Sequence, residues 1–157
     1  MSAGHIYHYF SNKEAIVTGI VEQYLREMLD LVNRIEEASK TIGLVEAVAA
    51  EVERGIATHP IERRNRLDLE ILAEASRNPG IATSIQQADR TVRTRLRELL
   101  IQLPALKKVT RPELDARISA MTTLFDGFEI RALCHPSMNK TATTKVIQQI
   151  FSMLMSE

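Results

Sequence analysis

The chain has 157 residues, 45% of them hydrophobic and 25% charged, which is typical of a folded globular protein and argues against a disordered chain. Basic and acidic residues number 20 each, so the formal net charge is zero and any contact with nucleic acid requires a local patch. The apolar runs are too short to cross a bilayer, no signal-peptide core follows Met1, and the lone Cys134 cannot form an internal disulfide, so we expect a soluble cytoplasmic protein.

The first segment, residues 1–13, concentrates tyrosine and histidine in a chain with only 4% aromatic residues. On a helix, the small residues at its start would permit close approach to a groove, and Ile6 and Phe10 would point to one buried side. Its tyrosine hydroxyls and histidine N–H groups suit phosphate oxygens, and Lys13 adds a positive charge. His5 and His8 lack a third ligand, so we favour contact with a DNA backbone over a metal site.

Apolar residues recur with helical spacing along the rest of the chain, and no segment alternates with a period of two, which predicts an all-α fold. The first long helix is predicted to begin at a capping box formed by Ser11 and Glu14. Its apolar stripe consists of Ile16, Ile20, Tyr24, Met28, Leu31 and Ile35. A second stripe runs over residues 42–56 and ends at His59-Pro60, because proline cannot continue a helix.

Four further helices are predicted towards the C-terminus. One spans about residues 65–77, and Asn78 and Pro79 then open a long helix that closes at Pro104. Thr110 and Glu113 form another capping box, whose helix ends at His135-Pro136. The last helix carries its apolar stripe to the C-terminus. The sequence therefore predicts six long helices after a short N-terminal one.

The last two predicted helices carry apolar residues on more than one face. Leu124, Ile130 and Leu133 lie outside the main stripe of the first, and Met153 and Met155 widen that of the second. One interpretation is burial between other helices of the same chain. The other is a helix pair that docks on a second copy and forms a four-helix dimer interface.

Four acidic residues are embedded in apolar helical segments: Glu70, Glu74, Asp126 and Glu129. Because a buried carboxylate is costly without a partner, one interpretation is pairing with Arg66, Arg77, Arg95 or Arg131. The other is a cavity in which one or two carboxylates orient a cationic or hydrogen-bonding ligand. The candidate ligand-binding residues are Met28, Leu69, Glu70, Leu72, Met121, Phe125, Phe128 and Glu129.

Two other patterns favour structural roles, and no pattern typical of a catalytic site is present. Arg90, Arg93, Arg95 and Arg97 alternate around one helix with acidic residues, which is typical of a solvated face. Cys134 and His135 point in different directions at a helix end, so we expect a buried thiol beside a helix-terminal cation. No glycine-rich phosphate loop, metal cluster or nucleophile–base pair is present, so we expect neither an enzyme nor a bound cofactor.

The string G-H-I-Y-H-Y-F-S-N-K-E-A-I, residues 4–16, resembles the signature of the TetR family, in which a short recognition helix precedes a long connecting helix. The resemblance implies that Tyr7 meets bases and backbone in the major groove. It also implies that Ser2, Ala3 and His5 face base edges and that His8, Tyr9 and Lys13 grip phosphates. Residues 1–13 would then be the remnant of a helix-turn-helix, and residues 14–157 a TetR-like ligand-binding and dimerisation domain.

The segments L-D-L-E-I-L-A-E-A-S-R-N-P-G-I-A and F-D-G-F-E-I-R-A-L resemble body domains found in betaine- and fatty-acid-type regulators. The resemblance implies a repressor that binds operator DNA as a homodimer through its last two helices and responds to a small molecule. Family members carry two helices before the recognition helix, so we expect either an upstream start or a truncation, and weak or no operator binding by this chain. The alternative is a truncated ligand-binding or dimerisation module without DNA binding.

Overall fold

The computed structural model describes residues 12–58 and 61–156 of the chain. Over these ranges it contains helices and no strand, which confirms the predicted all-α fold with six long helices. The elements are α2 (Lys13–Ile42), α3 (Leu44–Thr58), α4 (Ile61–Ala75), α5 (Pro79–Leu100), the short 3-10 helix η1 (Pro104–Leu106), α6 (Arg111–Cys134) and α7 (Lys140–Met155).

Side-chain caps start the helices close to where the sequence predicts. Asn78 accepts hydrogen bonds from the first backbone N–H groups of α5, and Thr110 accepts one from the N–H of Glu113 at the start of α6, both as predicted. The predicted cap of α2 is wrong by one position, because Asn12 and not Ser11 is the N-cap. Its side chain accepts a hydrogen bond of 2.8 Å from the N–H of Ala15.

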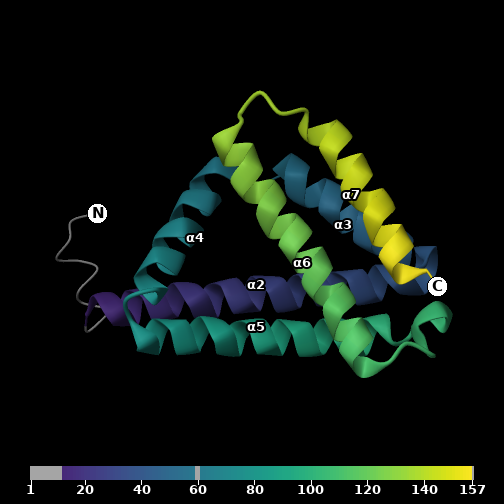
Figure 1. Cartoon of the computed structure of the whole chain (residues 1–157), viewed down its shortest axis with the longest axis horizontal. Helices are drawn as coiled ribbons and strands as arrows, with labels where there is room; N and C mark the ends of the chain where they lie inside the picture. Colours follow the sequence, from purple (N-terminus) through teal and green to yellow (C-terminus); the bar gives the residue numbers. More distant parts are fainter. Residues whose placement is uncertain (1–11, 59–60, 157) are drawn as a thin grey trace.

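Helices α2 and α5 lie side by side and form the long base of the molecule (Figure 1). Helix α4 leaves one end of this base, and α3 and α7 pack together above the other end. Helix α6 starts near the C-terminal end of α5 and crosses to the first part of α4, so it contacts α4, α5 and α7. The start of α2 therefore lies beside the α4–α5 turn, far from the C-terminal helix.

The core divides into two clusters along α2. The larger joins the second half of α2 to α3, α5, η1, α6 and α7, and its most buried members include Val32, Ile118 and Leu106. The smaller joins the first half of α2 to α4 and α5 through Val17, Val21, Ile71, Ile81 and Ala88. Burial of these apolar side chains is the main force that holds α4 and α5 to the start of α2.

The buried stripe of α2 differs from the predicted one at its N-terminal end. Val17 and Val21 are buried there, whereas Ile16 and Ile20 are half-buried and Tyr24 is 41% exposed. Ile16 and Val17 are both apolar, as are Ile20 and Val21, so the periodicity does not decide which residue of each pair faces the core.

Candidate functional site

Of the predicted DNA contacts, Ser2, Ala3, His5, Tyr7, His8 and Tyr9 lie outside the described residues. Lys13 is the first residue of α2, and its side chain is 72% exposed. Its Nζ donates a hydrogen bond of 2.9 Å to Oε2 of Glu74, near the end of α4. The ion pair thus joins two residues 61 positions apart and connects the predicted DNA-reading segment to the helical body.

The turn between α4 and α5 lies against the first turn of α2. Arg77 Nη2 donates to the same Glu74 oxygen at 3.3 Å, so Glu74 is paired with one of the arginines that the first interpretation named. The hydrogen bond and charge of Lys13, followed by those of Arg77, lower the pKa of Glu74. A Cβ atom at Gly80 would lie 2.8 Å from Oε1 of Glu14, so a glycine there permits close approach of the turn to α2.

The candidate ligand-binding residues come from α2, α4 and α6. On α4, Leu69, Glu70 and Leu72 are all exposed, and on α2 Met28 is half-buried. On α6, the candidate side chains range from buried to exposed: Met121 and Phe128 are buried, Phe125 is half-buried and Glu129 is exposed. Helices α4 and α6 pack against one another, so the structure brings these two sets of residues to one helix pair, although Met121 belongs to the larger core cluster.

A group of three aspartates marks the region where α4, α5 and α6 meet. Burial, together with the negative charges of Asp89 and Asp68, raises the pKa of Asp126. The sequence drew attention to Asp126 because of its apolar neighbours. It gave no signal for Asp68 and Asp89, since only the packing of three separate helices brings their charges near Asp126.

The arginines of α5 are not the solvated face that the sequence predicted. Arg95 binds Glu36 of α2 at 2.5 Å and Glu98 at 3.3 Å. Arg97 binds the Asp115 carboxylate at 2.6 Å, and Arg93 donates to the side chain of Ser119 on α6. The physical reason is that α5 lies between α2 and α6, so three of its four arginines reach polar groups on neighbouring helices, while Arg90 stays exposed.

A family model described as "BetI-type transcriptional repressor, C-terminal" matches residues 44–155, which is more than half of the chain. The chain belongs to the TetR family of transcriptional regulators. The matched range runs from α3 to the end of α7, which confirms the resemblance found in the sequence for the helical body. The search of curated proteins and the search of solved structures gave no match.

The family consists of transcriptional regulators and is not a class of enzymes. Within the described residues, no group of histidine, cysteine and acidic side chains could hold a metal ion. In the same part of the chain, no helix is both long and apolar enough to span a membrane.

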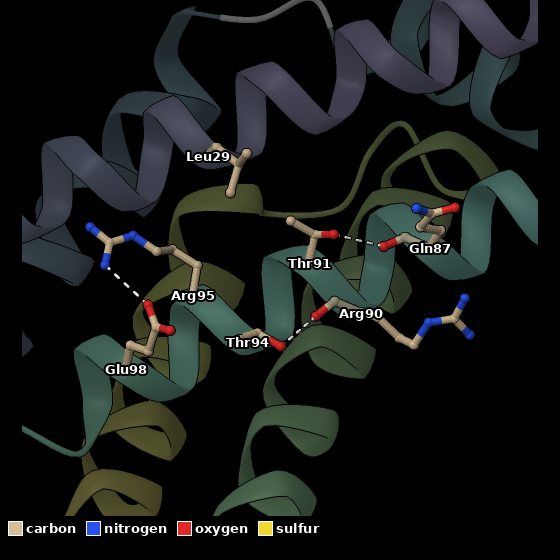
Figure 2. Close-up of a pocket in the computed structure, with 7 residues that line it drawn as sticks. All are labelled: Leu29, Gln87, Arg90, Thr91, Thr94, Arg95 and Glu98. Carbon is tan, nitrogen blue, oxygen red and sulfur yellow. Dashed lines mark hydrogen bonds and ion pairs between the residues drawn. The ribbon is translucent and has the colours of Figure 1, made fainter.

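A groove with a volume of about 430 Å³ runs along the α2–α5 pair of this TetR-family body (Figure 2). Its lining residues are Leu29, Gln87, Arg90, Thr91, Thr94, Arg95 and Glu98. None of them is a candidate ligand-binding residue, and Leu29 is the one apolar member. The Thr91 and Thr94 hydroxyls donate to carbonyl oxygens of their own helix, and Arg95 is held by carboxylates, so these groups are already engaged.

Helices α6 and α7 each present a second face to solvent. Opposite the buried stripe of α6 lies a row of small or apolar residues at helical spacing: Ala116, Ala120, Thr123, Gly127, Ile130 and Cys134. On α7, Val146 and Met153 are 53% and 65% exposed, on the side away from buried Ile147 and Phe151. The predicted burial of Cys134 within the protomer is therefore wrong, because its thiol lies on the outward face of α6.

Proposed function

We propose that this TetR-family chain binds operator DNA as a homodimer and that a small-molecule effector changes its affinity for DNA. The observation that carries the proposal is the position of α2. This helix of 30 residues begins at Lys13, the last residue of the predicted DNA-reading segment, and continues through both core clusters. A change in the packing of the body would therefore alter the direction of the helix that bears the reader.

The proposed DNA contacts are those that the TetR resemblance assigns to residues 2–13. Tyr7 would contact bases and backbone, and Ser2, Ala3 and His5 would face the base edges. The phosphate contacts would come from His8, Tyr9 and Lys13. Because the net charge of the chain is zero, these local contacts would supply the affinity.

Tyr7→Ala tests the DNA contacts. Duplexes that bind are first selected from a randomised pool, with both this 157-residue chain and the longest in-frame product of its gene. We expect Tyr7→Ala to weaken binding to the selected duplex by about 10-fold or more, corresponding to the loss of one specific base contact. An unchanged gel shift would contradict the assignment. Failure of every form to select DNA would favour a ligand-binding module without DNA function.

The proposed effector site lies between α4 and α6. Exposed apolar and acidic side chains on α4 and half-buried Phe125 on α6 offer the mixture of apolar walls and few polar groups that ligand sites use. A ligand that prefers one arrangement of these helices would shift the population towards it. Since the end of α4 touches the start of α2, that shift would change the spacing of two recognition helices across successive major grooves.

The proposed dimer uses the outward faces of α6 and α7. Small residues such as Ala120 and Gly127 permit close approach of a second helix, and Ile130, Val146 and Met153 add apolar surface. Two such helix pairs related by a two-fold axis would form a four-helix interface. This arrangement explains why α6 has apolar residues on both faces although it buries one face within the protomer.

A further inference from the structure

The ion pair between Lys13 and Glu74 involves a lysine to which the TetR resemblance assigns a different anionic partner. Lys13 Nζ lies 2.9 Å from Glu74 Oε2, and the same oxygen accepts a hydrogen bond from Arg77 at 3.3 Å. The lysine side chain is 72% exposed, so it lies where a phosphate can reach it. A carboxylate beside an ammonium group offsets part of the electrostatic attraction between that ammonium group and a phosphate.

We infer that Glu74 competes with the DNA backbone for Lys13, so that a DNA phosphate must displace the Glu74 carboxylate before Lys13 can contribute to binding. This inference rests on the proposed DNA-binding function. Displacement leaves Glu74 with Arg77 as a partner, so the exchange does not strand a carboxylate without a cation. Both side chains of the pair are in contact with solvent, so they can separate and pair again without any change in the packing of the body.

The position of Glu74 on α4 connects this competition to the proposed effector site. Leu69, Glu70 and Leu72 lie on the same helix, within two turns of Glu74. Helix α4 moves as a unit over this distance, so a ligand that shifts its exposed face also shifts the Glu74 carboxylate relative to the start of α2. Glu74 thus provides a direct route from the effector site to one of the proposed phosphate contacts.

The test is a double-mutant cycle on DNA affinity with the full chain and a fluorescent duplex of mixed sequence at low salt. We expect Glu74→Gln to tighten binding by about 1.5- to 5-fold, which is the range that an exposed ion pair supports. Glu22→Gln removes the same charge from an exposed position of α2 outside this ion pair and outside the proposed effector site, and is the matched control. We expect the gain from Glu74→Gln to exceed that from Glu22→Gln and to disappear in a Lys13→Met background.

A second readout reports on the ion pair without activity. NMR titration of the Glu74 carboxyl carbon should give a lowered pKa in the wild-type chain, and either Lys13→Met or saturating duplex should raise it. Lys40→Met, which removes a lysine at the opposite end of α2, should leave that pKa unchanged.

The outcomes separate the inference from the proposed function. Equal gains from Glu74→Gln with and without Lys13, or a Glu74 pKa that does not respond to duplex, would overturn the competition while DNA binding stands. If neither this chain nor the longest in-frame product of its gene binds duplex at low salt, the DNA-binding function is wrong and the competition is wrong with it.

Discussion

Asp126 is a carboxylate whose surroundings oppose its charge. Partial burial and the charges of Asp89 and Asp68 raise its pKa in the folded protein, so the ionised form destabilises the fold at neutral pH. The folded state then binds a proton more readily than the unfolded chain. The protonated Asp126 side chain therefore favours the folded state, and this contribution to stability is lost as the pH rises through the raised pKa of Asp126.

We therefore expect Asp126→Asn to raise the melting temperature by roughly 1–2 °C at neutral pH, because asparagine has a similar size and lacks the negative charge that Asp89 and Asp68 repel. The difference should vanish at a pH below the ordinary aspartate pKa of 3.8, where the wild-type carboxyl is neutral in both states. Thermal unfolding followed by circular dichroism at several pH values measures it. Asp115→Asn is the control: that aspartate is paired with Arg97, so its loss should lower the melting temperature at neutral pH. A stabilisation that persists at low pH would contradict this explanation.

The sequence singled out Glu74 and Asp126 as acidic residues in apolar segments, but it did not identify all of the charged side chains that lie near them. It offered pairing with an arginine as one of two interpretations for Glu74, and Arg77 is that partner in the structure. It did not predict the Lys13–Glu74 pair or the approach of Asp68 and Asp89 to Asp126, because those contacts join helices that are distant in the chain. The predicted roles of residues 2–9 fall on positions outside the described ranges and stay predictions.

The boundary between α2 and α3 depends on a single residue. Gly43 has φ 90° and ψ 155°, a backbone conformation that is essentially restricted to glycine. A Cβ atom at this position would also lie 2.7 Å from Oε2 of Glu46. The chain therefore turns from α2 into α3 without an intervening loop, and this turn positions Leu44 and Ala47 in the larger core cluster.

Gly43→Ala should lower the free energy of unfolding by about 1–3 kcal/mol, because alanine is strained in this conformation. Urea denaturation measures the loss. Gly127→Ala, measured at a protein concentration at which the chain is monomeric, is the matched control, since Gly127 lies inside α6 and a Cβ there meets nothing within 4 Å in its own protomer. The control should be neutral or slightly stabilising, as alanine favours a helix over glycine. Equal effects at the two positions would show that backbone strain at Gly43 is not the cause.

Helix existence and most helix ends were predictable from the sequence, because proline, asparagine and threonine act locally. Asn78 and Thr110 cap α5 and α6 as predicted. The face that α2 buries was less predictable, since Ile16 and Val17 are both apolar and only the positions of α4 and α5 decide between them. The arginines of α5 were misjudged for a related reason: their spacing suggests a charged surface, but α5 lies between two other helices.

The outward faces of α6 and α7, which have no neighbour in the part of the protomer that the structure describes, predict how the whole molecule assembles. Ile130 is 43% exposed and lies on the same outward row as Gly127. Stable dimers commonly bury about 800 Å² on each partner, and the outward sides of two adjacent helices of this length can supply such an area. A residue that is large or charged in the middle of this surface should therefore prevent association.

We expect Gly127→Leu and Ile130→Glu to convert a dimer into the 17.7 kDa monomer in sedimentation equilibrium. Both positions face outward, so the fold of the protomer should be retained, and circular dichroism checks this. Ile101→Glu is the control, because Ile101 is 51% exposed at the end of α5 and is not among the residues of the proposed interface. A wild-type chain that sediments as a monomer, or a dimer indifferent to both substitutions, would contradict the proposed interface.

The length of α2 has a mechanical consequence. At 1.5 Å per residue its 30 residues extend for about 45 Å, from Lys13 at one end to the glycine turn at the other. If that turn serves as the pivot, a tilt of about 5° at the glycine end would displace the Lys13 end by about 4 Å, the same order as the rise of one base pair. A long uninterrupted helix would thus convert a small tilt at its glycine end into a displacement of the proposed DNA-reading segment that is comparable to one base-pair step.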